Sequence, residues 1–399
     1  MNGDYSRLTF DPARNFSAVL MQQGRVLLDS DWNEQADLIN RQMRAALIDT
    51  FGRLHVASPE AFAISPGPDG LAIGRGRIYV DGLVAENRGA GRLVWDPALD
   101  ELCGEGAMPY RAQPFLPDAP PLPVEGGPYL IYLDVWQREV TAVGDPALND
   151  PALGMDMAVR RQTVWQVRIL GDARASAGKP LQEVAAFQPS GGRLTATMSP
   201  QWYTGAENRL YRVQIHAGGE PGKATFKWSR RNASIAARIR QYGPAQLHFD
   251  SAERFAADDW IEITDDRNEL NGIPGEMRRI VSIDGSGSAV TLNAPLTGAL
   301  SADSARATCW DQKGVGKAGV IPVPDGGRPV ALEDGISVSF TTARGVFRPG
   351  DYWLILARAA TRSIDPLHEA PPRGIHHHYA ELALFTPPGK IVDRRKLKT

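Results

Sequence analysis

The hydrophobic pattern of the chain changes from helical to strand-like near residue 52. Apolar residues recur along one face between Asp31 and Phe51, at Trp32, Ala36, Ile39, Met43 and Leu47. This spacing is typical of an amphipathic helix. Asp31 suits the N-cap, with Glu34 three residues later, and Gly52 suits a left-handed residue after the last turn. The sequence therefore predicts one N-terminal amphipathic helix at about residues 31–51.

After the predicted helix, short segments alternate apolar and polar positions and end at Gly, Pro, Asn or Asp. The segment RLYRVQIHAGG places Tyr211, Val213 and Ile215 on one face of a strand, and we expect that face to point inward. The Asp81–Gly82 pair is a strong signal for a two-residue hairpin. These patterns predict a mainly β (α+β) fold with a β-rich main body.

We expect four parts along the chain. Residues 1–60 form the N-terminal segment with the helix. Residues 61–244 form the β-rich main body, in which the Pro-rich stretch 110–128 is an ordered loop. In residues 245–300, strands and turns follow in quick succession between strand-like segments of the main body, which suits a small inserted β-barrel or meander. Residues 301–399 return to the main body and end in a basic tail.

Composition and charge exclude several classes of function. The chain has 399 residues, and its 43% of hydrophobic residues is ordinary for a globular protein. Its 44 basic and 46 acidic residues give a net charge of −2, which provides no electrostatic attraction for nucleic acid. The pattern of a signal peptide is lacking, as is an apolar run of membrane-spanning length. We therefore expect synthesis in the cytoplasm, no membrane insertion and no nucleic-acid partner.

Four of the seven histidines lie within a short window near the C-terminal end. On a strand, His376 and His378 share one face and His377 lies on the other. Together with His368 or Asp365, these two histidines are weak candidates for zinc ligands. The window has no HExxH motif and no cysteine, so we favour the hypothesis that the histidines form structural hydrogen bonds. The sequence thus predicts no metal site.

Other patterns suggest chemistry but lack the context that the chemistry needs. Gly314–Gly319 matches GxGxxG, but Pro322 and Pro324 prevent the helix that a dinucleotide site requires. The acidic stretch TDDRNELNG lacks the spacing of an EF-hand loop and is interpreted as a polar hairpin turn. A GxSxG motif is missing, and Cys103 and Cys309 lie in no active-site or metal-binding motif. We therefore predict no enzymatic activity and no cofactor.

Several blocks of the sequence are similar to one family of proteins. They include MNGDYSRLTFDPARNFSAVLMQQGRVLLDSDWNEQ, YLDVWQREVTAVGDPAL, ENRLYRVQIHAGG, FKWSRRNASI and GIHHHYAELALF. With these blocks the chain resembles, over nearly its whole length, an uncharacterised domain family found in phage-tail and contractile-injection-system gene clusters. Members tend to have a single histidine pair before the tyrosine, whereas this chain has three histidines, which argues against metal ligation by His376 as a shared property.

The resemblance implies a structural component of a phage-tail-like particle, at the baseplate or the tail-fibre attachment. Its implied partners are other tail or baseplate subunits and further copies of this chain. The candidate interaction residues are those of the helix stripe, which packs either on its own body or on a neighbour: Trp32, Ala36, Ile39, Met43 and Leu47.

Two alternatives belong to other classes of protein. A glycan-binding receptor module of a tail fibre would expose several of the nine tryptophans on one face. A cell-wall glycoside hydrolase would place two carboxylates opposite each other across a cleft.

Overall fold

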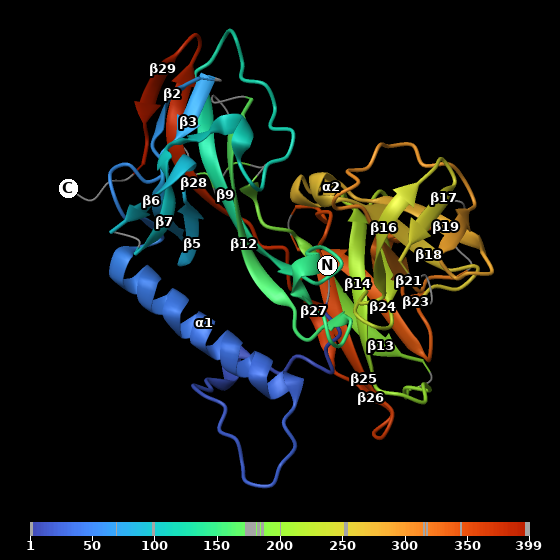
Figure 1. Ribbon diagram of the computed structural model, residues 1–399. Coiled ribbons are helices and arrows are strands. Elements are labelled where there is room, and N and C mark those ends of the chain that lie inside the picture. The colour runs from blue at the N-terminus through green and yellow to red at the C-terminus, as the bar shows by residue number, and fades with distance from the viewer. Residues whose placement is uncertain are drawn as a thin grey trace.

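The computed structural model describes residues 3–68, 70–97, 100–171, 181, 184, 187–199, 201–250, 254–313, 316, 318–343 and 345–395. Strands account for 43% of the chain and helices for 11%, which confirms the predicted β-rich class. Figure 1 shows a long helix that extends away from three β-rich bodies. None of the helices in the described ranges has the length and apolar composition that a membrane span requires.

The N-terminal segment contains a short 3₁₀ helix η1 (Pro12–Arg14) and the long helix α1 (Asp29–Phe51). The helix begins after Leu28, so the predicted N-cap Asp31 lies inside its first turn. Two acidic residues in that turn, Asp29 and Asp31, interact favourably with the positive end of the helix. Gly52 follows the helix with a φ of 83°, a value that favours glycine.

The first β body combines the early strands with the C-terminal ones. Its hydrophobic cluster includes Ile131, Val135 and Trp165. β28 pairs with β9 to complete a sheet of order β12-β9-β28-β29, so the C-terminal strands close this body. Its elements are β1 (Leu54–Val56), β2 (Ile64–Gly67), β3 (Gly70–Ile73), β4 (Gly76–Val80), β5 (Leu83–Asn87), β6 (Ala90–Asp96), β7 (Glu101–Gly106), β8 (Met108–Pro109), η2 (Tyr110–Ala112), β9 (Tyr129–Val140), η3 (Pro146–Leu148), β10 (Asn149–Asp150), β11 (Met155–Asp156), β12 (Arg160–Leu170), β28 (His378–Thr386) and β29 (Lys390–Asp393).

The second body is a sandwich of two antiparallel sheets. One sheet has the order β23-β24-β13-β27 and the other the order β22-β15-β14-β25-β26. Phe340 of the first sheet and Tyr211 and Trp353 of the second belong to one buried cluster. The elements are β13 (Gly192–Met198), β14 (Arg209–Ala217), β15 (Thr225–Ser229), β22 (Ile321–Pro322), η7 (Asp325–Gly327), β23 (Val330–Ala331), β24 (Ile336–Thr342), β25 (Tyr352–Arg358), β26 (Ser363–Ile364) and β27 (Leu367–Ala370).

The third body is a closed barrel inserted between two paired strands of the sandwich. Phe226 of β15 pairs with Ile321 of β22, and the whole barrel lies between them in sequence. The barrel order is β16-β17-β20-β19-β18-β21, and closure comes from the pairing of β16 with β21. Its elements are β16 (Ala236–Tyr242), β17 (Gln246–Phe249), β18 (Trp260–Thr264), α2 (Asp266–Leu270), β19 (Glu276–Ile283), β20 (Ala289–Leu292) and β21 (Arg306–Trp310).

Three features differ from the sequence-based expectations. The region predicted as one main body contains two hydrophobic clusters, because alternation marks a strand but not the sheet that it joins. The barrel strands span 236–310 and so extend past the expected range 245–300 on both sides. The stretch TDDRNELNG, predicted as a turn, contains the second helix α2, which Asp265 caps by accepting a hydrogen bond from the Asn268 backbone N–H at 2.9 Å.

Candidate functional site

The apolar stripe of α1 faces solvent. Trp32 is 81% exposed, and Ala36, Ile39 and Met43 are also exposed, while Leu47 is partly buried. Among the helix residues, only Ser30 and Leu38 are buried. Apart from Leu47, the stripe is not packed against the described β bodies, and such packing is the first of the two alternatives that the sequence leaves open.

The segment before the helix adds further exposed apolar side chains. Within residues 16–51, which we call the arm, ten of the 25 exposed large hydrophobic side chains of the described chain are found. Leu20 is 85% exposed and Val26 is 80% exposed. The ten are Phe16, Leu20, Met21, Val26, Leu27, Leu28, Trp32, Ile39, Met43 and Phe51. Such a concentration in one short segment is typical of an interaction site.

Polar contacts hold the opposite side of the helix to the first β body. Arg161 of β12 pairs with Asp37 at 2.8 Å. Arg44 donates two hydrogen bonds to the Asp81 backbone carbonyl, at 3.2 and 3.0 Å. An ordinary surface helix turns its apolar face to the protein. Helix α1 does the reverse, so its apolar face is available to another molecule.

Two histidines of the C-terminal window, His377 and His378, form hydrogen bonds to carboxylates. The Nδ1 atom of His377 lies 2.8 Å from Asp134 Oδ1, and Nδ1 of His378 lies 2.8 Å from Asp81 Oδ2. The hydrogen bond from His378 is the main cause that lowers the pKa of Asp81, against the opposing effect of burial. His377 and His378 thus each have a carboxylate as hydrogen-bond partner.

The candidate zinc ligands are distributed over different bodies. His378 is the first residue of β28 in the first body and His376 lies two residues before it, whereas His368 lies on β27 of the sandwich. Asp365 pairs with Arg358 at 3.5 Å. In the described ranges, no group of three His, Cys, Asp or Glu side chains is placed to hold a metal ion.

The glycine-rich motif at 314–319 is only partly visible, because residues 314, 315 and 317 lie outside the described residues. Pro322, which was expected to exclude a helix after this motif, lies in strand β22. The helix that a dinucleotide site needs is therefore replaced by a strand of the sandwich.

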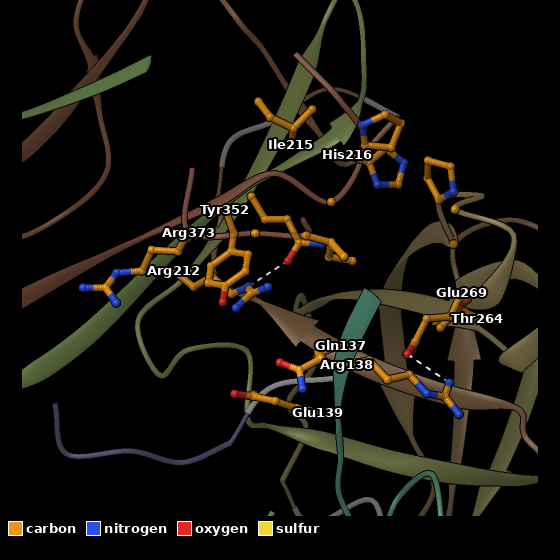
Figure 2. A pocket seen from close by; sticks show the side chains of 18 of the residues that line it. Gln137, Arg138, Glu139, Arg212, Ile215, His216, Thr264, Glu269, Tyr352 and Arg373 are labelled. Carbon is orange, nitrogen blue, oxygen red and sulfur yellow. Dashed lines mark hydrogen bonds and ion pairs between the residues drawn. The ribbon is translucent and has the colours of Figure 1, made fainter. Parts of the chain in front are cut away.

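A cavity of about 350 Å³ lies where the three β bodies meet beside α1, and we call it the junction cavity. It is lined by β9 and β12 of the first body, by β14, β15 and β25 of the sandwich, and by β18 and β21 of the barrel. Helix α1 contributes Arg44. Figure 2 shows that the labelled side chains around this space are mostly charged or polar.

One side of the junction cavity is formed by the buried carboxylate of Glu262. Lys227 donates to this carboxylate, Trp310 Nε1 donates to it at 3.2 Å, and His216 Nδ1 lies 3.6 Å away. Burial by itself raises the pKa of Glu262, but the charge of Lys227 and the hydrogen bonds outweigh it and hold the pKa below its usual range. Glu262 is therefore an ionised, well-partnered group.

A second set of carboxylates, Glu269 and Asp266 of α2, joins the barrel to the first body. Arg138 of β9 pairs with Glu269 and Asp266 of α2 at 3.3 and 3.4 Å, as Figure 2 shows for Glu269. Arg306, which is fully buried, also pairs with both. Burial raises the pKa of Glu269, but nearby cations, including Arg306 and Arg138, outweigh it and keep the pKa low. This network neutralises the carboxylates of α2.

Arg212 is a buried charged group of the cavity that forms no ion pair with the described residues, although the charges of Glu139 and Glu262 act on it from a longer distance. It is 7% exposed, and it donates from Nε to Gln214 at 2.7 Å and from Nη1 to Asn232 at 3.3 Å. Its guanidinium lies over the Tyr352 ring at 3.6 Å, beside which it is seen in Figure 2. Within the described part of the chain, no carboxylate oxygen lies within 4.0 Å of Arg212. Burial lowers the pKa of this guanidinium.

The N-terminal residues connect the walls of the junction cavity. The Gly3 backbone N–H donates to Glu139 of β9 at 3.2 Å, and Asn232 of the sandwich donates to the Gly3 carbonyl at 2.8 Å. Burial first, and then the charge of Glu139, raise the pKa of Tyr5. The segment therefore bridges the first body and the sandwich beside the cavity.

Sequence patterns did not identify the junction cavity. Tyr211, Val213 and Ile215 are fully buried, as predicted, but the opposite face of β14 carries Arg212, Gln214 and His216. Those three look like the solvent-facing side of an ordinary strand. Only the assembly of the three bodies encloses them.

Comparisons with known proteins show one family. A family model described as a family of unknown function (DUF6519) matches residues 1–197 and, a second time, residues 195–371. No curated protein and no solved structure matches the chain significantly. Because the two matches together cover most of the sequence, including the arm, the sandwich and the barrel, the chain belongs to the DUF6519 family.

Proposed function

We propose that this protein is a structural component of a multi-subunit assembly and that it docks onto a neighbouring subunit through the arm. The observation that carries the proposal is the reversed orientation of α1, whose polar side contacts the first body through Asp37 and Arg44 while Trp32, Ile39 and Met43 face solvent. An amphipathic helix of this kind suits a hydrophobic groove on a partner. A large aromatic side chain such as Trp32 is the type of residue that anchors an interface.

The assembly that we propose is a phage-tail-like particle, with this protein at the baseplate or the tail-fibre attachment. The support is the resemblance of its sequence blocks to the family found in phage-tail and contractile-injection-system gene clusters. The longest of those blocks, residues 1–35, contains the first half of the arm and the start of α1. The docking partner is accordingly another tail or baseplate subunit, and further copies of this chain belong to the same particle.

The two alternatives have weaker structural support. Six of the nine tryptophans are buried, and the exposed ones lie apart, Trp32 on α1, Trp95 on β6 and Trp202 in the loop between β13 and β14. This distribution does not favour a sugar-stacking platform. A glycosidase requires a general acid with a raised pKa. Glu262 and Glu269, two carboxylates of the junction cavity, have lowered pKa values and cationic partners, which favours a role without catalysis.

The test combines a double substitution in the arm with a matched control. We expect Trp32→Ala with Met43→Ala to leave the melting temperature of the isolated chain unchanged, because both side chains are exposed. The same variant should be missing from purified tail-like particles. The control is Leu93→Ala with Trp95→Ala, which removes two exposed apolar side chains from β6 and should assemble normally.

Two results would contradict the proposal. Particles of normal composition and activity from a strain that lacks the protein would exclude a structural role. Normal incorporation of the arm variant would exclude the arm as the docking surface. A melting temperature lowered by several degrees would instead mean that the stripe is buried within the chain.

A further inference from the structure

We propose that the junction cavity binds a small molecule that carries a carboxylate or phosphate group, and that Arg212 is its principal charged contact. This inference concerns a binding activity of the isolated chain and is independent of the arm. It is based on the charge balance of the lining, on the donors that Arg212 retains, and on the size of the space.

The lining of the junction cavity has an excess of positive charge. Its carboxylates Glu262 and Glu269 are paired with lining cations. Three lining arginines, Arg44, Arg212 and Arg373, have no ion pair with a carboxylate in the ranges that the structure describes. Among the lining carboxylates, Glu139 forms no ion pair with the described residues. Three unpaired arginines against one glutamate favour an anionic ligand.

Arg212 retains hydrogen-bond donors for such a ligand. A guanidinium has five N–H donors; the hydrogen bonds to Gln214 and Asn232 use one on Nε and one on Nη1, and Tyr352 takes a third, which leaves two. Its stacking on Tyr352 fixes the plane of the donor fork. The fork matches the geometry of carboxylate and phosphate oxygens, and a buried site strengthens the attraction because water does not screen it. A buried cation without a carboxylate partner is costly, and a bound anion removes this cost.

The size and the composition of the junction cavity define the class of ligand. A volume of about 350 Å³ is within the range of small-molecule sites. The lining also offers apolar surface from Ile273 and Ile375, which are both exposed. The carboxylate of Glu139 would accept hydrogen bonds from hydroxyl groups of the ligand. An acidic sugar or a phosphorylated small molecule satisfies these requirements.

The test uses the purified full chain with two anionic probes and one neutral probe. Sodium glucuronate represents the carboxylates, sodium pyrophosphate represents the phosphates, and glucose is the uncharged control, all at one ionic strength adjusted with sodium chloride. We expect saturable binding of at least one anion by calorimetry, with a rise in melting temperature, and no binding of glucose. The anion that binds identifies the preferred group.

Three variants connect the binding to the cavity. Arg212→Lys keeps the charge but removes the planar fork, so affinity should fall about tenfold. Arg373→Gln removes an exposed lining guanidinium that forms no ion pair with the described residues, so it should weaken binding without affecting folding. Arg240→Gln, the control, removes the same charge from an exposed pair with Asp250 outside the cavity and should bind like the wild type.

The proposal is wrong if neither anion binds saturably to the wild-type chain. It is also wrong if Arg212→Lys binds the anion with wild-type affinity, because Arg212 is then not the principal charged contact. Because the measurement needs no particle, either result would leave the assembly role of the arm unaffected, and a failure of the particle experiment would leave the anion site unaffected.

Discussion

The arm and the sandwich are both amphipathic, yet they use their apolar faces in opposite ways. In the sandwich, Trp353 of β25 is 1% exposed and packs in a cluster to which both sheets contribute. In the arm, Trp32 of α1 is 81% exposed, and polar contacts connect the helix to the first body. Trp32 belongs to the apolar stripe of a helix, and Trp353 belongs to a continuous apolar run in a strand. Amphipathicity therefore identifies a face that needs a partner, but it does not say whether the partner is within the same chain.

The energetic basis of the two regions differs accordingly. The sandwich depends on burial of large apolar side chains, which contributes about 1.5–3 kcal/mol for each fully buried one. The arm depends on a few ion pairs and hydrogen bonds near the surface, which contribute about 0–1 kcal/mol each. We expect the arm to be the more weakly held of the two regions in the isolated chain.

The largest expected effect distinguishes the two tryptophans directly. Trp353→Ala should lower the free energy of unfolding by about 3–5 kcal/mol, because it leaves a cavity in a closed core. Trp32→Ala should change it by less than about 0.5 kcal/mol, because the side chain is already in water. Urea denaturation of both variants measures the difference. A large loss of stability in Trp32→Ala would mean that the arm packs like the sandwich.

The next prediction concerns the dependence of stability on pH. The fold raises the pKa of a buried carboxyl in the sandwich and lowers the pKa of an exposed carboxyl in the arm. Burial raises the pKa of Asp351 from 3.8 to about 6, against hydrogen bonds from Ser190 and from the Arg348 backbone N–H. Its contribution therefore favours the folded state below pH 4 and is lost as the pH rises through 6. In Asp29 of the arm, hydrogen bonds from Ser6 outweigh burial and lower the pKa, so its contribution is lost as the pH falls.

The Asp351→Asn variant tests the direction of this pH dependence. The variant lacks this carboxyl, so its free energy of unfolding should decline less than that of the wild type between pH 4 and 6. For a shift of about two pKa units, the two declines should differ by about 3 kcal/mol. Urea unfolding at several pH values gives the difference between the two curves. Parallel curves for variant and wild type would show that Asp351 titrates normally in the fold.

A smaller effect concerns how the arm is held. Asp37→Asn removes the pair with Arg161, whose side chain is 45% exposed, so the global stability should fall by at most about 1 kcal/mol. Hydrogen exchange of the α1 backbone amides should nevertheless become faster. Asp250→Asn removes a comparable exposed pair on the barrel and should leave exchange in α1 unchanged. Unchanged exchange in Asp37→Asn would show that other contacts, such as those of Arg44, are sufficient.

The smallest expected effect on stability is that of removing metal ions with a chelator. Protein purified without a tag and without added zinc should contain clearly less than one metal ion per chain, because His377 and His378 bind carboxylates of the protein. A chelator should leave the melting temperature unchanged. One zinc per chain, lost in His376→Ala with His378→Ala, would require a metal site at the start of β28.

Local structure was largely encoded in the sequence. The Asp81–Gly82 pair forms the predicted two-residue turn between β4 and β5, with positive φ at both residues, because the chemistry of such a turn is contained in two adjacent residues. The amphipathic periodicity predicted a helix at 31–51, and α1 occupies Asp29–Phe51. The inward face of β14 was likewise evident, because strand alternation depends only on neighbouring residues.

Only the tertiary structure decided where these elements face and which of them meet. The sheet that each strand joins depends on pairing across long separations, as when β28 joins β9. The exposure of Trp32 depends on the polar contacts that hold the other side of α1 to the first body. The burial of Arg212 depends on three bodies that close over a strand face of ordinary polar appearance. Hydrophobic periodicity is set within a few residues, whereas burial is set by whatever distant surface the fold brings against them.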